Sequence, residues 1–144
     1  MAEETEARSF VPAFSEWVEA CWFGEHERAA DRLDALLQLP ASDVLVGSLS
    51  LLGRLVQAFL PGGEAEVAAA LAQHLIVTGP DPNREALIRD VVVAAGSAPS
   101  AQAGLLARHG PEAVITTALE CLSYLTQTEA ERQGVVPSSI LEDL

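Results

Sequence analysis

Apolar residues recur at spacings of three and four along most of the chain, which is the pattern of helices that bury one face. The clearest case is the stretch 43–60, whose apolar positions at heptad spacing are Leu45, Leu49, Leu52, Val56 and Phe59. No stretch alternates apolar and polar residues over more than a few positions, so the pattern indicates no β-strand. The sequence therefore predicts an all-α fold.

Glycine and proline clusters separate the periodic stretches and set their ends. Helices are predicted over about 12–23, 25–39, 43–60, 64–77, 82–95, 100–108 and 111–133. These six or seven short helices are expected to pack as antiparallel hairpins in a small solenoid-like or irregular bundle. We predict one helical domain at 10–133, between a flexible acidic N-terminus at 1–9 and a loose acidic C-terminal tail at 134–144. Three apolar residues of that tail could dock on the domain: Ile140, Leu141 and Leu144.

A repeated spacing of small and apolar residues follows three of the glycines. After Gly24 they stand at offsets of 5, 9 and 12, and the same offsets recur after Gly63 and Gly110. The stretch from Gly24 through Ala29 to Leu33 resembles the second half of a tetratricopeptide-type helical hairpin. This resemblance implies antiparallel helix pairs stacked side by side.

The chain carries 21 acidic residues and 8 basic ones, for a net charge of −13, and every basic residue is arginine. Without lysine it cannot form a P-loop, a protein-kinase ATP site or a Schiff-base nucleophile. The acidic excess argues against direct nucleic-acid binding, because Lys and Arg drive that binding by neutralising phosphates. One interpretation of the missing lysine is a GC-rich coding bias, and the other is selection against lysine modification; the abundance of Ala and Leu favours the first.

The negative charge is concentrated at the two ends of the sequence. Residues 1–34 hold nine acids and three arginines, and residues 112–144 hold six acids and one arginine. Helical spacing could place five of these acids on one negative surface of the first hairpin: Glu16, Glu19, Glu27, Asp31 and Asp34. One interpretation is a solvated face that keeps an apolar protein soluble. The other is a surface that steers a basic protein partner.

Five of the seven aromatic residues are also near the start of the chain: Phe10, Phe14, Trp17, Trp22 and Phe23. Trp17 and Trp22 point about 140° apart on a helix, so one apolar face cannot easily bury both. Either one packs inside while the other lies under a neighbouring segment, or an exposed Trp anchors a partner protein or a second copy of the chain. The candidate partner-binding residues are therefore Phe14, Trp17 and Trp22, together with the five acids above.

The residue spacing indicates no catalytic or metal site. The position three residues before each histidine holds Phe or Leu, not the Glu of a di-iron bundle. The nucleophile motif Gly-x-Ser-x-Gly is absent. Cys21 and Cys121 lie far apart, outside any CxxC pattern, and are interpreted as structural. We expect no metal, no cofactor and no enzymatic activity.

The acidic N-terminus is unlike a secretory signal, and the longest apolar stretches, 44–53 and 67–77, are too short to span a bilayer. We therefore expect a cytoplasmic protein without a membrane span. The expected function is non-catalytic binding of a protein partner, in an adaptor, inhibitor or immunity-type role. The alternative is a helical domain that encloses a small apolar ligand between its third and fourth helices, with Arg54 or His74 as the polar anchor.

Overall fold

The structure is a computed structural model that describes residues 2–59, 64–76, 81–95 and 99–142. Side chains are described for residues 10–58, 66–76, 81–95 and 102–142. All regular secondary structure in the described residues is helical, which confirms the all-α fold. The helices are α1 (Ala2–Trp22), α2 (His26–Leu37), α3 (Ala41–Phe59), α4 (Glu64–Leu75), α5 (Pro82–Ala95), α6 (Pro99–His109), α7 (Pro111–Gln133) and α8 (Pro137–Glu142).

The first helix is longer than its sequence pattern predicts. We expected it to begin near Pro12, after a flexible segment at 1–9, but α1 begins at Ala2 and contains Pro12 in its interior. Proline inside a helix removes one backbone hydrogen bond. The residues before Pro12 are rich in Ala and Glu, which have high helix propensity. The helix therefore extends on the N-terminal side of the proline as well.

The chain end also differs from the prediction. The predicted loose tail is wrong for Pro137–Glu142, which form α8. Pro137, Ile140 and Leu141 are buried there, because α8 packs against α1 and α7. Two of the three residues that could dock therefore do so, while Leu144 lies outside the described residues.

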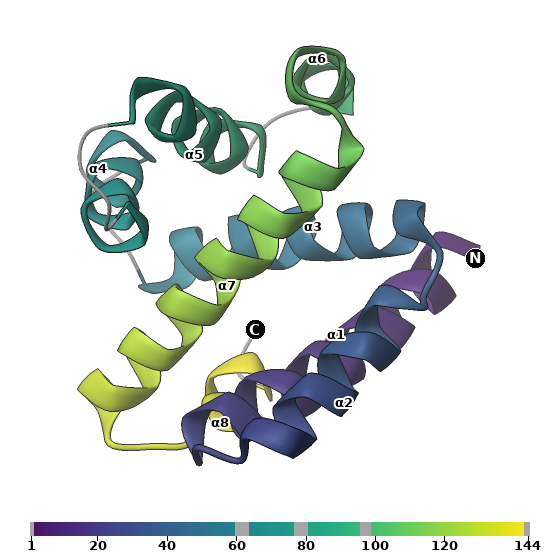
Figure 1. The fold of residues 1–144 in the computed structure, drawn as a ribbon, viewed down its shortest axis with the longest axis vertical. Helices are drawn as coiled ribbons and strands as arrows, with labels where there is room; N and C mark the ends of the chain where they lie inside the picture. The colour runs from purple at the N-terminus through teal and green to yellow at the C-terminus, as the bar shows by residue number, and fades with distance from the viewer. Residues whose placement is uncertain (1, 60–63, 77–80, 96–98, 143–144) are drawn as a thin grey trace.

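Two long helices, α3 and α7, cross at the centre of the molecule (Figure 1). The α1–α2 pair lies on one side of them, and α4 and α5 pack together on the other. α6 bridges α5 and α7, and α8 fills the angle between α1 and α7. The result is an irregular bundle in which neighbouring helices form the α1–α2 and α4–α5 pairs.

The core is one continuous cluster of buried side chains. Each of the eight helices contributes at least one residue to it. Its largest fully buried side chains come from most of the helices: Phe10, Phe14, Val18, Leu36, Leu49, Leu52, Leu55, Leu71, Ile88, Leu105, Leu122 and Ile140. Among the described residues, α1 and α3 contribute three each, and such burial in α3 is expected for a helix with only a narrow polar stripe. α1 approaches α3 closely at Gly47, where a Cβ atom would lie 2.7 Å from Cγ of Phe10.

Within the described residues, no single helix has both the length and the apolar character needed to cross a membrane. Together, α2 and Ala41–Ala58 of α3 meet that test, but they are bent by 111° relative to each other.

Candidate functional site

In the first hairpin, formed by α1 and α2, the second helix is buried along one narrow face only. α2 turns back beside α1 after Gly24, whose φ of +70° lies in the left-handed region that favours glycine. It packs against α1 and touches α3 at few positions (Figure 1). Leu36 is its fully buried residue, and Ala29 and Leu33 are half-buried on the same face. The rest of α2 therefore stays at the surface of the molecule.

The outward face of α2 carries three carboxylates at the spacing of one helical side. Glu27, Asp31 and Asp34 follow one another by four and three residues, and all three are exposed. No hydrogen bond or ion pair joins their carboxylates to another described residue. Helical spacing and exposure therefore place three of the five predicted acids on one side of α2.

The arginines of α2 are engaged within the hairpin. Arg28 forms an ion pair with Glu25 at 3.0 Å, and Arg32 forms one with Glu16 of α1 at 3.2 Å. Glu16 is thus held next to α2 but is partly neutralised there. Glu19 is half-buried on α1, and no described contact brings it to α2. The five predicted acids therefore form a smaller unpaired set of three, which we call the α2 acidic face: Glu27, Asp31 and Asp34.

The three aromatic residues predicted to contact a partner are buried or half-buried. Phe14 is fully buried, so the prediction that it contacts a partner is wrong for this conformation. Its ring stacks on Phe10 with centroids 5.7 Å apart and meets Trp17 edge-on at 5.8 Å. Trp17 and Trp22 are half-buried and pack against the core, so neither stands free at the surface.

The exposed aromatic of the hairpin is Phe23, which the sequence prediction did not select. Its side chain is 58% exposed, at the turn between α1 and α2. The sequence did contain a signal for this exposure. If the helix is continued to position 23, Phe23 falls on the same side as the exposed Pro12 and Glu16, opposite the buried Phe10 and Phe14. Immediately after it, Glu25 to Arg28 line a shallow surface hollow of about 390 Å³.

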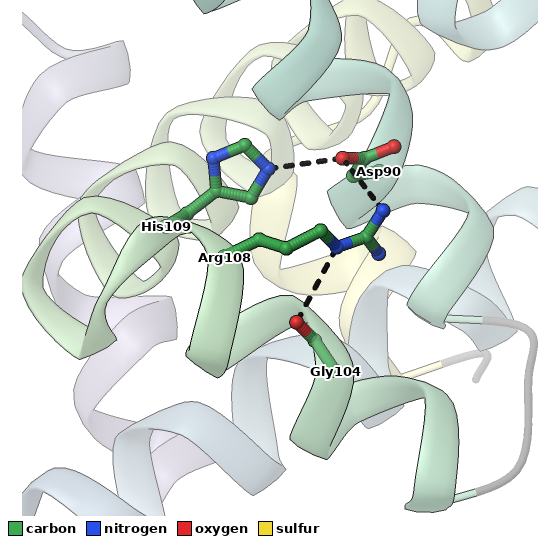
Figure 2. A network of polar contacts seen from close by, with 4 residues as sticks. All are labelled: Asp90, Gly104, Arg108 and His109. Atoms are coloured by element: carbon green, nitrogen blue, oxygen red, sulfur yellow. Dashed lines mark hydrogen bonds and ion pairs between the residues drawn. The ribbon is translucent and has the colours of Figure 1, made fainter.

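A second group of polar side chains joins α5 to the end of α6 (Figure 2). Nε2 of His109 lies 2.9 Å from a carboxylate oxygen of Asp90, and each side chain is 21% exposed. Arg108 approaches the same oxygen at 3.6 Å, and its Nε donates to the carbonyl of Gly104 at 3.4 Å. Both bases lie in the last turn of α6, where positive charge is favoured by the helix dipole.

This group has a clear structural role. An Asp–His pair can orient an imidazole for catalysis when a nucleophile lies on its free nitrogen. In the part of the chain that the structure describes, no Ser, Thr or Cys is hydrogen-bonded to His109. The arrangement closes α6 onto α5, much as Arg84 of α5 pairs with Glu120 of α7.

The remaining candidate residues lie apart from one another. Among the described residues, no group of three or more His, Cys, Asp or Glu side chains could hold a metal ion. Burial raises the pKa of the Cys121 thiol to about 12, with the negative charge of Glu120 as a second cause. Arg54 and His74, the polar anchors predicted for a core ligand, are both exposed, and the His74 ring stacks on Tyr124 at 4.8 Å.

Comparisons with protein-family models, curated proteins and solved structures found no match to this chain.

Proposed function

We propose that the protein binds another protein through its first hairpin, and that the partner presents basic side chains to the α2 acidic face. The observation that carries this proposal is that Glu27, Asp31 and Asp34 are exposed on one side of α2 without a described ion-pair partner. Like charges this close repel one another by a few tenths of a kcal/mol per pair, which an opposite charge would relieve.

The exposed Phe23 supports the same surface. Aromatic side chains, phenylalanine included, are enriched at protein interfaces relative to the rest of the protein surface. Phe23 lies at the turn of the hairpin, beside the hollow lined by Glu25 to Arg28. A partner that covers the turn would bury this ring and meet the carboxylates along α2. The proposed role is that of a binding protein, in an adaptor, inhibitor or immunity-type setting.

The test compares two variants with the same change in net charge. The hairpin variant combines Glu27→Gln, Asp31→Asn and Asp34→Asn. The control variant combines three neutralisations on other helices, at the exposed residues Glu66, Glu112 and Glu131. Each variant and the original chain are used as bait for affinity capture from a native lysate, at low and at high salt.

We expect the original chain and the control variant to retain the same protein, and the hairpin variant to lose it. Capture should weaken at 0.5 M NaCl, because exposed charges are screened over about 10 Å already at 0.1 M salt. Equal retention by the hairpin variant, or binding that is insensitive to salt, would contradict the proposal. So would the capture of no protein above background by the original chain.

A further inference from the structure

α8 closes the molecule by reaching back from the end of α7. Gly134 ends α7 in the left-handed conformation at φ +71°, and the N–H of Val135 donates to the carbonyl of Ala130 at 3.0 Å. This tight turn reverses the chain, so that α8 lies against both α7 and α1 (Figure 1). α8 therefore connects the first helix of the fold to the last long one.

Among the described residues, the contacts that hold α8 in place are apolar. Pro137, Ile140 and Leu141 are buried, and Ile140 is fully so. In the part of the chain that the structure describes, no side-chain hydrogen bond or ion pair joins α8 to α1 or α7. A helix of six residues is also too short to be stable through its own backbone hydrogen bonds. The docked state of α8 thus depends on three apolar side chains.

We propose that α8 is a strap that opens as a unit while the other helices stay folded. A short segment that is held by a few side chains opens at a lower free energy than the core that supports it. Opening uncovers the parts of α1 and α7 on which Ile140 and Leu141 pack. It also loosens the hairpin, because α1 then meets the central helices mainly along α3. This proposal concerns the fold and stands whether or not the hairpin binds a partner.

The test places a thiol in the strap and another in the core, by the same substitution. Ile140→Cys puts a thiol at a fully buried position of α8, and Ile88→Cys puts one at a fully buried position of α5. Because both variants lose the same atoms from a fully buried isoleucine, the core variant controls for the truncation itself. Each full-length variant is labelled with iodoacetamide under native conditions, and peptide mass spectrometry measures the modification at each cysteine. The native Cys121, fully buried in α7, serves as an internal reference in both proteins.

We expect the thiol at position 140 to react at least about tenfold faster than the thiol at position 88 and than Cys121. Urea below the unfolding transition should leave the rate at position 140 nearly unchanged, because a local opening exposes little surface. Equal rates at positions 140 and 88, rising together with urea, would overturn the proposal, since α8 would then open only when the whole chain unfolds. A slower rate at position 140 would overturn it as well.

Discussion

At the residue scale, close packing between α1 and α3 depends on a glycine inside a helix. Glycine usually weakens a helix interior by up to about 1 kcal/mol relative to alanine. Gly47 nevertheless lies in α3, because Cβ and Cγ of Phe10 occupy the space that a side chain would need. Those atoms are close to the backbone of α1 and cannot move aside as the end of a long side chain could. The close approach of the two helices thus outweighs the helix propensity at this position.

Two Gly→Ala substitutions should change the free energy of unfolding in opposite directions. Gly47→Ala should destabilise the protein by about 1–3 kcal/mol, because the added methyl group overpacks the contact with Phe10. Gly104→Ala should stabilise it by about 0.5–1 kcal/mol, because Gly104 lies in α6 with no atom within 4 Å of the added carbon. Urea unfolding of both variants measures the two free energies. Stabilisation by Gly47→Ala would show that α1 can shift away from α3 at little cost.

Some residues of the candidate site could be predicted from the sequence and others could not. The spacing of Glu27, Asp31 and Asp34 gives their common face directly, because a helix repeats every 3.6 residues. The burial of Phe14 and the exposure of Phe23 depend on which sides of α1 are covered by other helices. The helical phase puts Phe23 on the side opposite Phe10 and Phe14, but the packing of α2, α3 and α8 against α1 decides which side is buried.

At the scale of elements, periodicity predicted the seven longer helices and missed the shortest. Stretches such as 43–60 contain several turns, so their apolar spacing is distinct. α8 has six residues, fewer than two turns, and its sequence shows only a proline followed by two apolar residues. The start of α1 was misplaced for a different reason, since Pro12 is compatible with a first helical turn and also with the interior observed. The helical state of α8 is stabilised by its contacts with α1 and α7, which no local sequence pattern indicates.

The C-terminal turn of α7 contains a buried carboxylate whose effect on stability should depend on pH. The Glu129 side chain is 7% exposed, and Arg132 holds its pKa below the ordinary value of 4.5 by hydrogen bonding, against the opposing effect of burial. A carboxyl whose pKa is lowered on folding stabilises the protein above its ordinary pKa. That contribution is lost as the pH falls through the lowered value.

Glu129→Gln should therefore reduce the free energy of unfolding at pH 7 by about 1 kcal/mol, a modest value because the Arg132 side chain is 65% exposed. The difference from the original chain should shrink as the pH is lowered from 5 towards 3. Urea unfolding at pH 7, 5 and 3 measures it. Glu131→Gln, at an exposed position in the same turn, is the control and should change stability by less than about 0.5 kcal/mol at pH 7. A difference that stays constant with pH would contradict a role for the ionised carboxylate.

At the scale of the whole molecule, the fold class follows from the sequence and the arrangement does not. Periodicity defines helices and their apolar faces, but it does not say which faces meet. The contacts of α3 with α7 and of α1 with α8 join segments far apart in the chain, and they are set by shape and volume. The resemblance of Gly24 to Leu33 to half a helical repeat therefore predicted the hairpin itself. It did not predict how α3 and α7 cross beside that hairpin.

Charge is the whole-molecule property with the clearest consequence for stability. Folding brings 21 acidic residues close together with only 8 arginines to offset them, so the folded chain repels itself. Salt weakens this repulsion and also weakens ion pairs such as Arg32 with Glu16, which favour the folded state. The excess of 13 negative charges makes relief of repulsion the larger of the two effects.

Raising NaCl from 20 mM to 500 mM should therefore increase the thermal midpoint by about 3–5 °C, as expected for roughly 1 kcal/mol in a chain of this size. Differential scanning calorimetry at both salt concentrations measures the shift.

If the repulsion is strongest along the α2 acidic face, the variant with Glu27→Gln, Asp31→Asn and Asp34→Asn should be more stable at low salt and respond less to NaCl. The matched variant neutralised at Glu66, Glu112 and Glu131 should keep most of the response, because Glu66 lies on α4 while Glu112 and Glu131 lie near opposite ends of α7, so the three charges are not neighbours on one helix face. A midpoint that falls with salt would mean that the ion pairs outweigh the net charge. An equal response in the two variants would mean that the repulsion is spread evenly over the surface.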